Sequence, residues 1–327
     1  MKLKNYTVKR YESKYFSDWN AFISTAKNAT FLFNRDFMEY HSDRFEDFSL
    51  MIFQEDKLVC VLPANRVGAS IYSHQGLTYG GMVYNNKIKL ISVVEILKNI
   101  LKFLHDSNII KLQIKIIPSI YHELPAEELN YALFLAEAQL IRRDSLSVVD
   151  LSKSYSLSKD RKIGIKKGIK NKLEIKEVDD FNEFWNQILI PNLELKYQTK
   201  PVHSLKEITQ LKALFNKNIR QFNIYDNGLI VAGCTIFESK TVAHSQYISS
   251  KQDKKELGGI DLLHHYLLTE TFKEKLFFDF GNSNESLGKK LNKGLVYWKE
   301  SFGARTITHD YYEVETLNYI KLNNFII

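Results

Sequence analysis

The same order of β-rich and helical segments occurs twice along this chain of 327 residues. The stretch "FSLMIF" in the first half corresponds to "RQFNIYD" in the second, "YSHQGLTYGG" to "AHSQYISS", and "IKLQIKI" to "KLFFDFG". A single hydrophobic core rarely organises more than about 250–300 residues, so two domains are expected at this length. Strands and helices alternate in each half, which predicts two similar α/β units, each around its own sheet.

We place the boundary between the two domains at residues 152 and 153. In the first domain, apolar residues recur at helical spacing in "LISVVEILKNILKFLHD", which predicts one long amphipathic helix. Pro125 predicts the start of a second helix, because proline is favoured at the first helical position. In the second domain, the stretch from Ser283 to Phe302 is predicted to be one helix that follows the strand "KLFFDFG".

Composition excludes several classes of protein. The two cysteines, Cys60 and Cys234, each lie in an apolar run without CxxC spacing, so buried structural thiols are expected and no metal or disulfide framework is indicated. The N-terminus "MKLKNYTVKRYESKYF" is charged, and no apolar run approaches the ~18 residues that span a bilayer. A cytoplasmic protein without a bound metal is expected.

Two catalytic signatures can be set aside. Asp279-Phe280-Gly281 resembles the magnesium-binding triplet of protein kinases, but the glycine-rich loop, strand lysine and catalytic loop of a kinase are missing. A Gly-x-Ser-x-Gly elbow is also missing, which excludes the usual serine hydrolase arrangement. The adjacent His264 and His265 point to different faces of a helix and cannot hold one metal ion together there.

One segment gives the chain its basic character. Residues 159–172 carry seven Lys or Arg residues and a single acidic residue, so this segment accounts for most of the net charge of +7. A solvated helix face and a site for a phosphate-bearing ligand are both compatible with this pattern. Aromatic residues for base stacking do not interrupt the segment, which argues against an RNA-binding module. Arg161 and Lys166 are the expected phosphate contacts.

The second half resembles the core of the GNAT acyltransferase fold in "AHSQYISS", the turn at Gly258-Gly259 and the helix "IDLLHHYLL". In that family a strand parts from its neighbour, and the following helix N-terminus binds the pyrophosphate of acyl-CoA. Such termini suit anions because their free N–H groups and dipole face outward. The family's loop begins with Gln or Arg, has Gly at its fourth position and ends in Gly or Ala; Lys255, Gly258 and Ile260 fall at these positions. The resemblance implies cofactor contacts from Gly258 and Gly259.

The whole chain resembles the tandem-domain branch, the FemAB- and FemX-like acyltransferases. "FDFGNSNESLGKKLNKGLVYWKESFGAR" is similar to their C-terminal signature, in which Trp298-Lys299 and Phe302-Gly303 match a Phe-Lys-x-x-Phe-Gly ending. "RKIGIKKGIK" resembles their interdomain helix, and "SHQGLTYGG" a loop of the first domain. The resemblance implies two tandem GNAT-like domains of mixed α/β (α+β) class, each a mainly antiparallel sheet flanked by helices.

Three residues are catalytic candidates. In the FemX-like enzymes the lysine matched by Lys299 lies at the acyl group, where an ammonium can hold a developing oxyanion; a solvated lysine at a helix C-terminus is the alternative. His244 is a candidate proton acceptor or, alternatively, a core histidine. Asp279 ends a strand, where carboxylates of open α/β sheets face the ligand crevice.

Further residues are candidates for substrate binding. Tyr247 would join His244 in one cleft only if a bulge interrupts their strand. Ser283 is a substrate-binding candidate and, alternatively, the N-cap of the following helix. His74, Gly80 and Gly81 are expected to face an interdomain groove, where consecutive glycines allow a ligand to approach the backbone closely.

The expected function is transfer of an acyl or aminoacyl group to an amine on a cell-envelope or surface-polysaccharide precursor. Acyl-CoA or aminoacyl-tRNA would serve as co-substrate, with no tightly bound cofactor, and the acceptor would be a small molecule or a lipid- or nucleotide-linked one. One alternative is an acetyl-CoA-dependent N-acetyltransferase acting on a nucleotide-linked amino sugar. The other is a non-catalytic protein that binds phosphate ligands or nucleic acid through the basic helix.

Overall fold

The computed structural model describes residues 5–326, which divide into two compact units. Unit 1 comprises residues 5–144 together with 308–326, and unit 2 comprises residues 145–307. The boundary predicted from the sequence lies near the first of these divisions but assigns the C-terminal segment to the second domain. In the structure that segment packs in unit 1, because β17 (Arg305–Glu315) pairs antiparallel with β8 (Lys111–Lys115).

Unit 1 contains two groups of paired strands, in the orders β1-β3-β4-β7 and β17-β8-β6-β5-β2. Its strands and α-helices are β1 (Tyr6–Arg10), α1 (Phe16–Ile23), α2 (Arg35–Met38), β2 (Glu46–Asp47), β3 (Leu50–Gln54), β4 (Lys57–Leu62), β5 (Asn65–Val67), β6 (Ser70–Tyr72), β7 (Val83–Tyr84), α3 (Leu90–Asp106), β8, α4 (Glu128–Leu135) and β17. The chain passes into unit 2 along β9 (Gln139–Asp150) and returns along β17.

The long amphipathic helix predicted in unit 1 is confirmed as α3. Its apolar face, including Val94, Leu97, Leu101 and Leu104, is fully buried in a core shared with β3, β4 and β8. Burial of each such side chain stabilises the folded state by roughly 1.5–3 kcal/mol. The second helix begins later than predicted: α4 starts at Glu128, and Pro125 lies in the loop before it.

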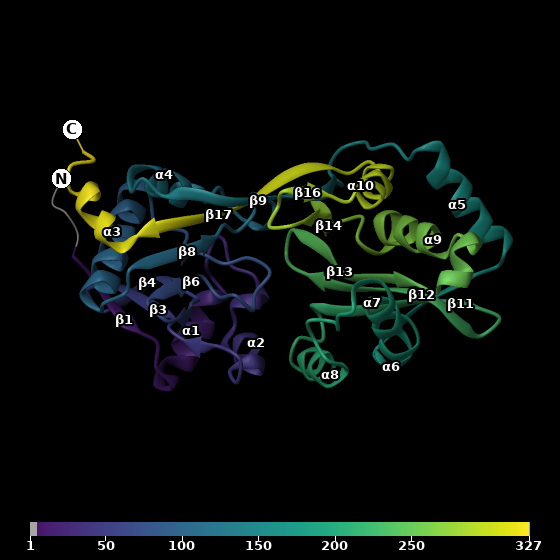
Figure 1. Cartoon of the computed structure of the whole chain (residues 1–327), viewed down its shortest axis with the longest axis horizontal. Helices are drawn as coiled ribbons and strands as arrows, with labels where there is room; N and C mark the ends of the chain where they lie inside the picture. Colours follow the sequence, from purple (N-terminus) through teal and green to yellow (C-terminus); the bar gives the residue numbers. More distant parts are fainter. Residues whose placement is uncertain (1–4, 327) are drawn as a thin grey trace. The chain divides into compact units, whose positions relative to one another are not determined.

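Unit 2 is built on the strand order β10-β11-β12-β13-β14-β9. Its strands and helices are α5 (Lys159–Lys170), β10 (Glu174–Val178), α6 (Asn182–Phe184), a π-helix (Trp185–Leu189), α7 (Ile190–Tyr197), α8 (Leu205–Leu214), β11 (Ile219–Asp226), β12 (Leu229–Glu238), β13 (Val242–Ser250), α9 (Gly259–Tyr266), β14 (Phe277–Asn282), β15 (Asn284–Glu285), β16 (Lys290–Leu291) and α10 (Lys293–Glu300). Helices α9 and α5 lie on one face of this sheet, and α6, α7 and α8 lie on the other (Figure 1).

One pair of strands in unit 2 is parallel and short. β13 pairs with β14 only from Val242 to His244, opposite Phe277 to Asp279, although β13 continues to Ser250. The neighbouring pair of β13 with β12 is antiparallel and continues to the end of β13. The two parallel strands therefore part immediately after His244 and Asp279. This parting is the feature that positions the candidate site.

The prediction of a single helix from Ser283 to Phe302 is wrong. The segment forms a small hairpin of β15 and β16, and only Lys293–Glu300 is α-helical. Ser286, Leu287 and Gly288 all have positive φ values, which a helix cannot contain. The helix N-cap is Asn292, whose side chain accepts a hydrogen bond from the Leu295 amide, and not Ser283.

Cys60 and Cys234 are both fully buried, as predicted, and burial raises the pKa of each thiol, that of Cys234 to about 12. Across residues 5–326, no helix combines the length and the low polarity needed to cross a bilayer.

Candidate functional site

The three predicted catalytic residues lie together where β13 and β14 part. His244 Nδ1 is 2.9 Å from Asp279 Oδ2, and Asp279 Oδ1 accepts a hydrogen bond from the Gly281 amide at 2.6 Å. Asp279 is 1% exposed. The Nδ1–H tautomer of His244 donates to this carboxylate, which leaves Nε2 as a proton acceptor.

Lys299 is buried, which contradicts the alternative of a solvated lysine at the helix end. It is 3% exposed, and its Nζ donates to the carbonyl oxygens of Gly281 at 3.0 Å and Asn282 at 2.6 Å. Burial lowers the pKa of the ammonium to about 8, and the nearby charge of Asp279 opposes this shift. An ammonium has three N–H groups, so one remains after these two hydrogen bonds.

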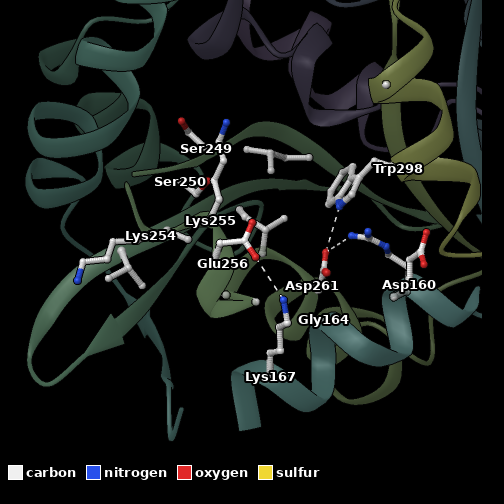
Figure 2. A pocket seen from close by; sticks show the side chains of 18 of the residues that line it. Asp160, Gly164, Lys167, Ser249, Ser250, Lys254, Lys255, Glu256, Asp261 and Trp298 are labelled. Carbon is white, nitrogen blue, oxygen red and sulfur yellow. Dashed lines mark hydrogen bonds and ion pairs between the residues drawn. The ribbon is translucent and has the colours of Figure 1, made fainter. Parts of the chain in front are cut away.

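A cavity of about 740 Å³ lies at the N-terminus of α9. Gly258, Gly259 and Asp261 line it, together with the end of β13 and residues of α5 and α10, among them Trp298 (Figure 2). Five cationic residues and three acidic ones line the cavity. Burial and the neighbouring charge of Lys255 lower the pKa of Lys196, one of these cations. The excess of positive charge beside first-turn amides suits an anionic ligand.

Asp261 lines this cavity and is held by contacts from α5 and α10. Its carboxylate pairs with Arg161 of α5 and accepts a hydrogen bond from Trp298 Nε1 at 3.1 Å (Figure 2). The predicted phosphate contact Arg161 therefore lines the cavity with its charge already matched by Asp261. Lys166 is exposed on α5 and does not line the cavity. Lys167, which sequence reasoning did not single out, does line it and pairs with Glu256 at 3.2 Å.

Gly258 and Gly259 lie where they were predicted, at the start of α9, and Gly258 is required there. Its φ is +79°, and a Cβ added at this position would lie 2.2 Å from the Gly164 carbonyl oxygen of α5. Gly164 and Gly168 are also buried against α9, where a Cβ on either would meet Asp261 or Leu262. The glycines of the basic segment therefore let α5 pack closely on α9.

We expect Gly258→Ala to lower the free energy of unfolding of unit 2 by more than about 1 kcal/mol, because it adds both backbone strain and a steric clash. Urea denaturation measures the change. Gly228→Ala is the matched control, since Gly228 has a φ of +78° and nothing within 4 Å of an added Cβ. Equal losses in the two variants would contradict the close packing of α5 on α9.

Tyr247 and Ser283, the predicted substrate-binding residues of unit 2, make contacts within the protein or lie buried. A bulge does interrupt β13 between Ser245 and Tyr247, but the Tyr247 hydroxyl is 2.7 Å from His203 Nδ1 and its ring packs on Trp185. Ser283 is buried, and its Oγ has no hydrogen-bond partner. It adjoins Asn282, a carbonyl partner of Lys299.

His74, Gly80 and Gly81 belong to unit 1. A Cβ at Gly80 would lie 2.0 Å from the Ser73 carbonyl oxygen, so the room that this glycine provides is filled by the protein's own backbone and not by a ligand. Gly81 has a φ of +93°. His74 lines a separate small cavity within unit 1.

Comparison with known proteins confirms the predicted fold. The chain is similar to FemX, with a TM-score of 0.66 and 7% identity over 97% of this chain and 99% of that chain. It is also similar to a tandem GNAT protein from the clavulanic acid biosynthesis pathway (TM-score 0.52, 10% identity, 95% and 99% covered) and to L-PGS from Bacillus licheniformis (TM-score 0.54, 11% identity, 81% and 85% covered). No protein-family model and no curated protein matches the sequence. The fold is thus of the tandem GNAT type related to FemX.

Proposed function

We propose that unit 2 is an acyltransferase that moves an acyl or aminoacyl group to an amine on a cell-envelope or surface-polysaccharide precursor. The observation that carries this proposal is the parting of β13 from β14 directly beyond the His244–Asp279 pair, with the Lys299 ammonium buried beside it. An acid–base pair and a buried cation, placed together where two strands part, suit acyl transfer.

The cavity at α9 is the proposed donor site. Its surplus of positive charge and the first-turn amides of α9 fit a phosphate-bearing acyl donor. Acyl-CoA and aminoacyl-tRNA share this chemistry: each carries an activated acyl group, as a thioester or an ester, at the end of a phosphate-containing chain. The fold shared with a tandem GNAT protein supports a donor of this kind.

The chemistry follows from the three side chains. The acceptor amine attacks the acyl carbonyl carbon and forms the new C–N bond, while the carbonyl oxygen becomes an oxyanion that the third N–H of Lys299 holds. His244 Nε2 accepts the proton that the attacking nitrogen loses, and Asp279 stabilises the resulting imidazolium. Collapse of the intermediate breaks the C–S or C–O bond, and the leaving thiolate or alkoxide takes the proton from His244.

Thermal unfolding with each candidate donor tests the proposal. A ligand at 100 times its Kd stabilises the folded state by about 2.7 kcal/mol, so acetyl-CoA or an aminoacylated tRNA should raise the midpoint in a concentration-dependent way. Lys255→Glu should weaken this response, whereas Lys206→Glu, an exposed substitution on α8, should not. A response to neither donor would overturn the donor site.

The two donor classes and the non-catalytic alternative give different results. A response to acetyl-CoA and not to charged tRNA supports the N-acetyltransferase alternative, and the reverse supports aminoacyl transfer. A ligand-induced rise in the unfolding midpoint, without turnover of any amine acceptor, supports a binding protein instead.

A further inference from the structure

A second cavity lies wholly within unit 1. It has a volume of about 230 Å³, and Arg35 of α2, Asp47 of β2, His74 and the aromatic residues Tyr11 and Phe45 line it. All of its lining residues precede β9, so the cavity is formed without any residue of unit 2. Nothing in the chemistry proposed for unit 2 uses these side chains.

Arg35 gives the cavity a fixed polar wall. The guanidinium is 3% exposed and lies 3.8 Å from the centre of the Tyr11 ring. Its Nε donates to Glu39 at 3.0 Å, Nη2 pairs with Asp47, and Nη1 donates to Ser49 Oγ at 3.3 Å. Three of its five N–H groups are therefore engaged, and the two neighbouring carboxylates balance its charge, which disfavours an anionic ligand.

His74 supplies a buried polar group that lacks a partner. The side chain is 3% exposed, and its Nδ1 has no hydrogen-bond partner. Burial, together with the neighbouring His41, lowers the pKa of His74 to about 3 against the opposing effect of Asp47, so the ring is neutral at physiological pH. A buried ring nitrogen without a partner costs free energy that a hydrogen-bonding ligand would recover.

The backbone around His74 is held in place by a partly buried lysine, Lys115. His74 has a φ of +62°, which is uncommon for a residue with a side chain. Lys115 Nζ donates to the carbonyl oxygens of Leu77 at 2.6 Å and Gln75 at 3.2 Å, and the Lys115 amide donates to Ser73 Oγ at 2.8 Å. The loop therefore presents His74 to the cavity in a preorganised conformation, as binding sites require.

The charge and size of the cavity define the ligand. One cation, Arg35, faces two carboxylates, Glu39 and Asp47, so the lining is negative by one charge with His74 neutral. A phosphate or carboxylate group is disfavoured there, whereas hydroxyl and ammonium groups find acceptors. The volume is below the roughly 300–1,000 Å³ of pockets for drug-sized ligands, so it suits one small ring.

We propose that this cavity binds a single unphosphorylated sugar ring, and binds it best as an amino sugar. Glu39 and Asp47 accept hydrogen bonds from its hydroxyl and ammonium groups, His74 makes a further hydrogen bond, and the rings of Tyr11 and Phe45 contact its C–H face. The site is independent of acyl transfer in unit 2, and its failure would leave that proposal intact.

Ligand-observed saturation-transfer NMR on the full chain tests the site with glucosamine, galactosamine and mannosamine, the neutral methyl glucoside, and glucose 6-phosphate. We use each at about 10 mM, which detects millimolar affinity. A pH near 6.5 keeps the amines charged, since comparable amino groups have pKa values of about 7.7–8.0. At least one hexosamine should bind more tightly than the neutral sugar, and the phosphorylated sugar should bind least. Absence of binding by all three hexosamines, or a preference for the phosphorylated sugar, overturns the proposal.

Two variants locate the binding. Ser42 is exposed at the rim, so Ser42→Trp should fold, fill the cavity and weaken hexosamine binding at least tenfold, while Ser42→Ala should bind as the parent does. Glu39→Gln removes one negative charge from a half-exposed side chain and should reduce the preference for the amino sugar severalfold. Unchanged binding in Ser42→Trp, with an unchanged melting temperature, places the sugar elsewhere and overturns the site. An unchanged preference in Glu39→Gln overturns the assignment to an amino sugar.

Discussion

Replacing Lys299 by methionine is expected to lower turnover about 10²–10³-fold, because it removes one preorganised donor to the oxyanion of the transition state. Methionine is close to lysine in length and keeps the buried volume filled, so the main structural loss is the pair of hydrogen bonds to the Gly281 and Asn282 carbonyls. Binding of the donor, followed by thermal unfolding, should be unchanged because Lys299 does not line the α9 cavity.

The matched control is Lys293→Met, which removes an exposed lysine from the same helix. It should leave turnover within about twofold of the parent, as expected for an exposed side chain that does not line the α9 cavity. If the two methionine variants turn over at the same rate, Lys299 has only a structural role.

The pH dependence gives a second test of the Lys299 role. Burial lowers the pKa of this ammonium to about 8, below its usual value of 10.5, so the charged form required for catalysis is lost as the pH rises through about 8. Turnover of the parent should therefore fall about tenfold for each pH unit above 8, and Lys299→Met should not show this fall. A fall at the same pH in Lys299→Met would assign it to another group.

The sequence predicts the order of the elements and the fold well, because both depend on local patterns. Periodic apolar residues define α3, and the two matching halves define the tandem arrangement. Lys299, His244 and Asp279 were each predicted as catalytic candidates, from a resemblance in one case and from positions on strands in the others. Their mutual distances depend on where β13 and β14 part, which only the folded sheet determines.

What the sequence did not reveal depends on contacts between distant segments. Asp261 joins Arg161 and Trp298, although 100 residues separate it from the former. The cavity of unit 1 combines α2, β2 and the loop at His74 in the same way. The hairpin inside the segment predicted as a helix had a local signal, because Gly288 and the N-cap Asn292 both favour a break before the helix.

Replacing Asp279 by asparagine is expected to lower turnover by about 10²–10⁴-fold, the contribution of general acid–base catalysis. The asparagine oxygen can keep the hydrogen bond from the Gly281 amide, which directs its NH₂ group toward His244 Nδ1. His244 must then accept at Nδ1 and carry its proton on Nε2, the tautomer that cannot take a proton from the amine.

His244→Ala should be about as slow as Asp279→Asn, and the double variant should be little slower than either, because the two residues act as one unit. His265→Ala, on α9 of the same unit, is the control that should retain activity. Additive losses in the double variant would contradict a shared role.

Asp279→Asn has one further consequence that a purely structural aspartate would not produce. The negative charge of Asp279 raises the pKa of Lys299 against the effect of burial. Without this charge the ammonium loses its proton at a lower pH, so the alkaline fall in the residual turnover should move below pH 8. If turnover of Asp279→Asn still falls only above pH 8, Asp279 does not act on Lys299. The His–Asp pair and the lysine then do not form one catalytic cluster.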